Sequence, residues 1–200
     1  MQSPVTLALV ALNVVVSVIG FQNRAFFENN AFWVGPIRQK GQWHRVVVSA
    51  FLHVITLHLL VNMYVLYMFG AILENVLGPV GFTILYVASL LAGNAWEYVD
   101  NFNKADYRAV GASGATSGVI LGFCLLYPFA MLFLFFIIPM WAIVAGVGFI
   151  LVSFILSQRD NTMIAHGAHL GGALAGGAIT LFFVPGAWGN LVAQITDKLG

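Results

Sequence analysis

The stretch Gly111-Ala-Ser-Gly-Ala-Thr-Ser-Gly-Val-Ile-Leu-Gly122 decides how this chain folds. Glycine recurs in it every four residues, at Gly114, Gly118 and Gly122. Such a stripe of small residues lets two membrane helices pack backbone to backbone. A second stripe follows later in the chain, at Gly172 and Gly176. We predict that the two stripes pack against each other, which brings Ser113 and His169 to a similar depth.

The composition places this stretch in a membrane protein. The chain has 200 residues, of which 60% are hydrophobic and 8% are charged. A soluble domain of this size lacks the polar surface to cover so many apolar residues. The formal net charge is only +1 and Lys and Arg form no run, so we exclude nucleic acid as a partner. The single cysteine, Cys124, excludes a disulfide framework.

Apolar runs that are long enough, or nearly so, to cross about 30 Å of hydrocarbon predict six helices. They cover about residues 4–21, 49–73 and 82–96, a segment from residue 113, a segment ending near residue 156, and a segment from after residue 161 to 183. A polar loop, residues 97–108, follows the third helix, and Pro128 and Pro139 mark a turn between the fourth and fifth.

The predicted fold class is therefore all-α, a polytopic bundle of six transmembrane helices, with residues 1–200 forming one membrane domain. The first apolar segment has no basic flank and no A-x-A cleavage site, so we expect a retained helix and not a signal peptide.

Polar side chains inside or at the ends of these spans are the functional candidates, because burying them in lipid is costly. They are His53, His58, Asn62, Glu74, Ser113, Ser117, His166 and His169. His58 and Asn62 are four residues apart, so they project from one helix face and can converge on one point.

The segment Gly111-Ala-Ser113-Gly114 marks a tight entry into a helix. A small hydroxyl there can approach a substrate backbone, and free N–H groups and the positive end of the helix dipole favour an anion. A serine nucleophile and an oxyanion hole need these features. Ser113 lies roughly 8 to 17 Å from the polar loop, depending on whether the link is helical or extended. Water must therefore enter a pocket below the surface.

Four motifs follow one another in the chain. They are Gln42-Trp43-His44-Arg45, F-L-H-x4-H-x3-N from Phe51 to Asn62, G-A-S-G from Gly111, and A-H-x2-G-x3-G from Ala168 to Gly176. Each motif alone is weak, but together they resemble the rhomboid family of intramembrane serine proteases, in its basic six-helix bacterial form, over nearly the whole chain.

The resemblance implies a catalytic dyad with no acidic third member. Ser113 attacks the substrate and His169 takes its proton. His58 and Asn62, with the Ser113 backbone N–H and with Gly111 beside them, hold the tetrahedral oxyanion. The resemblance also implies transmembrane protein substrates within a lipid bilayer, and no cofactor.

The remaining motif positions are expected to support the fold. They are Trp43, Arg45, His53, Glu74, His166, Gly172 and Gly176. We expect Trp43, Arg45 and His53 to brace the first loop. Glu74 is expected to tie the end of the second helix to the loop that follows.

Three departures from the family pattern affect these expectations. His44 stands between Trp43 and Arg45, where the family usually has the two residues adjacent. Ser117 stands where an aromatic residue is common, so we expect different ring packing against His169 and lower activity. His166 stands where an asparagine is often found, one turn before His169, and is an alternative base or hydrogen-bond partner.

Other function classes remain as alternatives. The main one is a rhomboid-like pseudoprotease that binds transmembrane helices without cutting them. A metal site is disfavoured because the chain has no H-E-x-x-H and no H-x3-H, and a transporter because it shows no inverted repeat. Basic residues gather on the side of the expected catalytic mouth, which alone would predict a cytoplasmic mouth. The resemblance implies the reverse, an inner-membrane protein with its mouth facing the periplasm or exterior.

Overall fold

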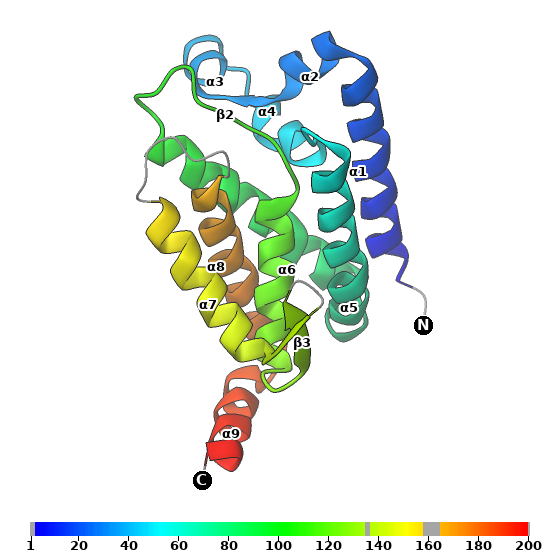
Figure 1. The fold of residues 1–200 in the computed structure, drawn as a ribbon, viewed down its shortest axis with the longest axis vertical. Coiled ribbons are helices and arrows are strands. Elements are labelled where there is room, and N and C mark those ends of the chain that lie inside the picture. The colour runs from blue at the N-terminus through cyan, green and yellow to red at the C-terminus, as the bar shows by residue number, and fades with distance from the viewer. Residues whose placement is uncertain (1–2, 135–136, 158–164, 200) are drawn as a thin grey trace.

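The computed structural model describes residues 3–134, 137–157 and 165–199 as a bundle of helices (Figure 1). The longer helices are α1 (Pro4–Gln22), α5 (Thr56–Asp100), α6 (Ser113–Leu126), α7 (Ala142–Ser157), α8 (His166–Phe183) and α9 (Ala187–Leu199). Among the described residues, α1 and α5 are long and apolar enough to cross a membrane, and α8 with α9 forms a third candidate span that bends by 100°. The predicted class, an all-α polytopic membrane bundle, is confirmed.

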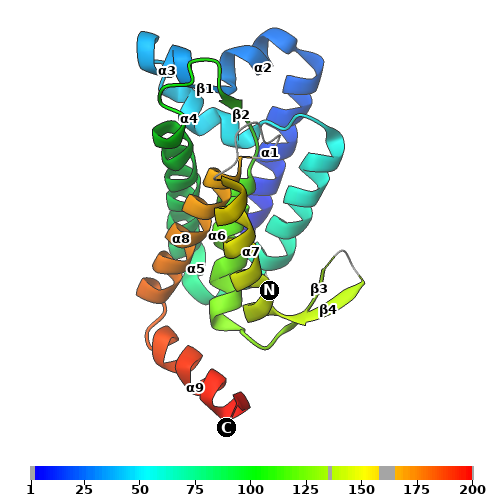
Figure 2. The same ribbon diagram turned by 60° about the vertical axis from the view of Figure 1, so that its left-hand side comes forward.

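Helix α5 combines the second and third predicted helices. It is 45 residues long, but its backbone leaves helical geometry at Gly78, where φ is 72° and ψ is 166°. The following residue, Pro79, cannot donate the hydrogen bond that a continuous helix would need. The break separates an arm of residues 56–77 from an arm of residues 79–100. Helix α6 lies between the two arms (Figures 1 and 2).

Some boundaries differ from the expectation. The second helix was expected to start at Ser49, but Ser49–Phe51 forms a 3-10 turn and α5 begins at Thr56. The expected start of the last helix, after residue 161, lies outside the described residues. The turn between α6 and α7 is an antiparallel hairpin of β3 (Met131–Leu134) and β4 (Ile138–Trp141).

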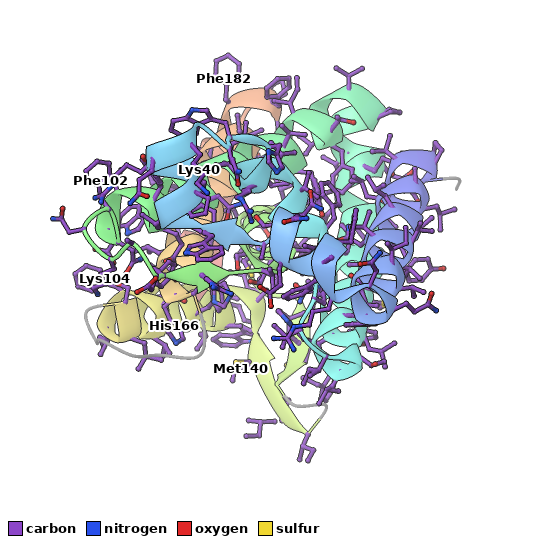
Figure 3. The ribbon with its side chains drawn as sticks, turned by 90° about the horizontal axis from the view of Figure 1, so that it is seen from above. Lys40, Phe102, Lys104, Met140, His166 and Phe182 are labelled. Atoms are coloured by element: carbon purple, nitrogen blue, oxygen red, sulfur yellow. The ribbon has the colours of Figure 1, made fainter. Side chains whose placement is uncertain are left out.

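The first loop folds over one end of the bundle (Figure 3). It contains α2 (Arg24–Asn30), β1 (Phe32–Trp33), α3 (Val34–Lys40) and α4 (His44–Val48). Strand β1 pairs antiparallel with β2 (Arg108–Ala109), which belongs to the loop before α6. Trp43 packs its ring on Tyr98 with centroids 5.5 Å apart, so the second arm of α5 also contacts this loop.

Arg45 is hydrogen-bonded within the first loop. Its side chain is buried and donates to the carbonyl oxygens of Glu28 and Ala31, each at 2.8 Å, and to the Gln42 side chain at 2.7 Å. Burial, and next the charge of Arg108, lower the pKa of Arg45. The three hydrogen bonds stabilise the charged guanidinium in this position.

Two support residues contact α1 instead of the expected loops. Glu74 accepts hydrogen bonds from the backbone N–H groups of Val5 at 3.0 Å and Thr6 at 2.7 Å, and from the Thr6 hydroxyl at 2.7 Å. Its carboxylate therefore caps the start of α1. His53 Nδ1 lies 2.8 Å from the Ser17 hydroxyl. Polar groups inside a membrane bundle must find partners within the protein, and the neighbouring helix supplies them here for the Glu74 carboxylate and for His53 Nδ1.

Helices α6 and α8 cross with their backbones in contact, which confirms the predicted pairing of the glycine stripes. A Cβ atom at Gly172 would overlap the carbonyl oxygen of Gly114, and one at Gly176 would overlap Cα of Gly118. No side chain fits between the helices at these points. Ser113, the neighbour of Gly114, is thereby held at the crossing.

Replacing Gly172 with alanine should destabilise the fold, because its Cβ would overlap backbone atoms that move only with the whole helix. Overpacking of this kind costs about 1–3 kcal/mol, so the apparent melting temperature in detergent, followed by circular dichroism, should fall. Gly148→Ala is the matched control, because nothing lies within 4 Å of a Cβ at this position inside α7. Equal melting temperatures for the two variants would contradict the backbone crossing.

Candidate active site

Ser113 is the first residue of α6, and the turn before it sets its position. Gly111 has φ of 131°, a conformation that favours glycine. Its N–H donates to the Ser49 carbonyl oxygen at 3.0 Å, and a Cβ on it would lie 2.7 Å from Cε1 of His58. The Gly111 N–H is already hydrogen-bonded to Ser49, so it is not free to donate to an oxyanion. Gly111 contributes to the expected oxyanion site by leaving space for the His58 ring.

Asn62, on the first arm of α5, is fixed to the helix of Ser113. Its buried side chain accepts a hydrogen bond at Oδ1 from the Thr116 hydroxyl at 3.0 Å, and its Nδ2 donates to the His58 carbonyl oxygen at 2.9 Å. An amide nitrogen carries two hydrogens, so these bonds use only one of them. Thr116 was not a sequence candidate, although its position three residues after Ser113 puts the two on neighbouring turns of one helix face.

His169 is the fourth residue of α8, and the residue before it, Ala168, contacts α6. A Cβ at Gly114 would lie 3.2 Å from the carbonyl oxygen of Ala168, so the chain neighbours of Ser113 and His169 touch. Ser113 and His169 are both half-buried. Among the described residues, no hydrogen bond joins Ser113 Oγ to the His169 ring. In substrate-free enzymes such bonds are often long, and they tighten when substrate binds.

Two rings contact the His169 imidazole. Phe149 of α7 stacks on it with centroids 5.7 Å apart and planes at 28°, and His166 meets it edge-on at 5.8 Å. Ser117 is buried and donates to the Ser113 carbonyl oxygen at 2.6 Å. The ring packing against His169 therefore comes from α7 and not from the Ser117 position on α6. Phe149 carried no signal in the sequence, because it is one more phenylalanine in an apolar run.

The candidate residues come from three helices, with His58 and Asn62 on α5, Ser113 on α6 and His169 on α8. The His58 ring of α5 contacts Gly111, two residues before Ser113, and Ala168 of α8, the residue before His169, contacts Gly114. Ser113 starts α6, where the first backbone N–H groups have no acceptor within the helix and the helix dipole favours an anion. This geometry brings together a hydroxyl, two imidazoles and a place for negative charge.

Two cavities lie elsewhere. One of about 380 Å³ is lined in part by Trp33, Lys40 and Arg45 under the first loop. The other, about 250 Å³, lies between α6 and α9. In the part of the chain that the structure describes, no group of three or more His, Cys, Asp or Glu side chains could hold a metal ion.

The sequence is similar to those of known proteins. A family model described as the Rhomboid domain matches residues 40–186. The chain is 31% identical over 185 residues to RHOMBOID-like protein 12, mitochondrial, of Arabidopsis thaliana, covering 84% of this chain and 55% of that protein. It is 33% identical over 138 residues to the Homo sapiens Presenilin-associated rhomboid-like protein, mitochondrial, covering 66% of this chain and 35% of that protein.

A bacterial relative matches over a shorter stretch of the chain. YdcA of Bacillus subtilis (strain 168), which is named as a candidate rhomboid protease, is 38% identical over 93 residues, covering 46% of this chain and 44% of that protein. The matched regions thus span between about a third and just over half of the length of these three relatives.

Replacing Gly111 with alanine should disturb the His58 ring, because the new Cβ would press on it. We expect Ser113 to lose at least about tenfold in reactivity toward a fluorophosphonate probe, since a small misplacement of reacting groups can cost 100-fold. The matched control is Gly41→Ala, where φ is also positive, at 64°, but nothing lies within 4 Å of a Cβ. Equal Ser113 labelling rates in the two variants would contradict a role for the contact between Gly111 and the His58 ring.

Proposed function

Because the chain belongs to the rhomboid family, we propose that it is an intramembrane serine endopeptidase that cleaves transmembrane segments of membrane proteins. The observation that carries this proposal is the convergence at the α6–α8 crossing. Gly114 and Ala168 are in contact there, and they are the chain neighbours of Ser113 and His169. Residues 1–200 would act as one membrane domain.

The proposed reaction is hydrolysis of a peptide bond in two steps. Ser113 Oγ attacks the substrate carbonyl carbon while His169 takes the hydroxyl proton as general base. The amine leaves with the proton that His169 returns, and Ser113 is left as an acyl ester. Water, activated by His169, then attacks the ester and releases the acid product and the free serine.

The negative charge of each tetrahedral intermediate needs donors that are already in place. The Ser113 backbone N–H is one, since it starts α6 and has no acceptor within the helix. The second N–H of Asn62 Nδ2 and the His58 ring supply the others. The hydroxyl of Thr116 and the turn at Gly111 hold these two side chains, so they need little reorganisation during the reaction.

No acidic residue is needed to orient the base in this proposal. The stacked ring of Phe149 and the edge of His166 restrict the His169 imidazole instead. His166 is partly exposed and stays an alternative base, one turn of helix away.

The substrates proposed are single-span membrane proteins that unwind locally. A membrane helix hydrogen-bonds its own backbone and hides its carbonyl groups. A span must therefore fray before Ser113 can attack it, and small or helix-breaking residues near the membrane surface lower that cost. Part of the specificity would be conformational for this reason.

We propose that the protein lies in a cell's inner membrane with its mouth facing the periplasm or exterior. The positive-inside rule concerns cations on free loops, whereas two cations of the mouth contact aromatic rings of the folded loops. The Arg38 guanidinium lies over the Phe102 ring and donates a hydrogen bond to the backbone carbonyl oxygen of Phe102 at 2.7 Å. Arg108 lies 3.6 Å from the centre of the Trp33 ring. Cations held in this way contribute little to the positive-inside rule, so they do not argue strongly for a cytoplasmic mouth.

A serine-directed fluorophosphonate tests the proposal without knowledge of the substrate. Detergent-purified wild type should be labelled, and Ser113→Ala and His169→Ala should each lose labelling, because the hydroxyl is a weak nucleophile without its base. Labelling is measured by in-gel fluorescence, and mass spectrometry identifies the modified peptide.

Two variants control for general effects of substitution. Ser157→Ala removes a partly exposed serine at the end of α7, and His44→Ala removes a first-loop histidine. Both should label like wild type. A folded wild type that stays unlabelled would favour the pseudoprotease that binds transmembrane helices without cutting them, and helix-binding assays would then follow.

A further inference from the structure

Glu97 is a buried carboxylate near the end of the second arm of α5. The sequence placed it in the polar loop of residues 97–108, but α5 continues to Asp100 and carries Glu97 into the bundle. Only 3% of its surface is exposed. A buried carboxylate is costly unless several donors surround it, so its partners indicate why it is there.

One oxygen of Glu97 holds the start of α8. Oε1 accepts a hydrogen bond from the backbone N–H of Ala168 at 2.7 Å, and the N–H of Gly167 also interacts with the carboxylate. A Cβ at Gly167 would lie only 2.9 Å from Oε1, so glycine allows the close approach. These N–H groups belong to the first turn of α8 and have no partner within the helix. His169 is the next residue.

The other oxygen holds the loop that leads to Ser113. Oε2 accepts hydrogen bonds from the Tyr107 hydroxyl and from Asn101 Nδ2, the latter at 3.0 Å. Burial, and next the charge of Glu97, raise the pKa of Tyr107. At neutral pH the phenol is therefore protonated, and its O–H donates a hydrogen bond to the Glu97 carboxylate.

From Tyr107 onward the chain is fixed as far as α6. The Tyr107 carbonyl oxygen accepts from the Val34 N–H at 3.2 Å, β2 pairs with β1, and the Gly111 N–H donates to Ser49. Ser113 follows two residues later. One carboxylate thus connects the start of the His169 helix with the segment that carries Ser113.

We infer that Glu97 is a positioning residue for the Ser113–His169 pair, acting through Ala168 on one side and Tyr107 on the other. The inference rests on the proposed function. Displacement of reacting groups by about 1 Å can cost 100-fold in rate, so a link that fixes both segments would affect reactivity more than overall stability.

The test measures kinact and KI for fluorophosphonate labelling of Ser113 in detergent, together with the apparent melting temperature. Glu97→Ala removes both links and should lower kinact by about 10- to 100-fold while KI stays within about twofold. Glu97→Gln keeps an oxygen that can accept from Ala168 and should fall between Glu97→Ala and wild type. Tyr107→Phe breaks only the link to the Ser113 segment, and its kinact should fall as well.

A second reading follows the local structure directly. Hydrogen exchange, measured by mass spectrometry on peptides that contain Ala168, should speed up in Glu97→Ala and stay near the wild-type rate in Tyr107→Phe. The matched controls are Asp197→Asn, which removes an exposed carboxylate on α9, and Tyr98→Phe, which removes a nearby phenol hydroxyl. Both controls should keep the wild-type kinact.

The outcomes separate this inference from the proposed function. A wild type that labels, with Glu97→Gln and Tyr107→Phe labelling at the same rate, overturns the inference alone. A fall in melting temperature without a fall in kinact, measured well below the transition, overturns it too, since the carboxylate would then be only structural. A wild type that does not label overturns the proposed function and the inference with it.

Discussion

Backbone contact between α6 and α8 leaves no space for a side chain at their crossing, and the candidate site depends on that contact. Lipid offers no hydrophobic drive for two apolar helices to associate, so close packing of small residues has to hold them. Gly114 against Gly172 and Gly118 against Gly176 supply it. A glycine-to-alanine change at this crossing is therefore a change to the distance between Ser113 and His169.

Helix α5 completes the site from both of its arms. The first arm brings His58 against Gly111 and Asn62 against Thr116. The same helix carries two buried carboxylates, each placed at the start of another helix. Glu74 accepts from the first N–H groups of α1, and Glu97 from those of α8. A carboxylate at a helix N-terminus satisfies donors that lipid cannot satisfy and meets the positive end of the dipole.

The sequence predicts those features that depend on local pattern. Hydropathy predicts the helical segments and the all-α membrane class, and the four-residue spacing of glycine predicts the α6–α8 contact. The residues Ser113, His58 and Asn62 stand out because polar groups are rare in such spans. Their motifs point to the same family as the comparisons do.

Features that depend on contacts between distant segments were missed or wrong. Glu74 and His53 bind α1, because their hydrogen-bond partners in three dimensions lie about 70 and 36 residues away in the chain. Glu97 looked like a loop residue, since a charge usually ends an apolar span. Phe149 could not be distinguished from other apolar residues of α7 until its ring was seen on His169.

The most direct test of the account is cleavage within the bilayer. Wild type and Ser113→Ala would be reconstituted in liposomes with a mixture of single-span membrane proteins, and new chain termini would be mapped by mass spectrometry. We expect termini inside or at the edge of apolar spans with wild type and none with Ser113→Ala. Equal termini in both samples, or cuts confined to soluble loops, would contradict it.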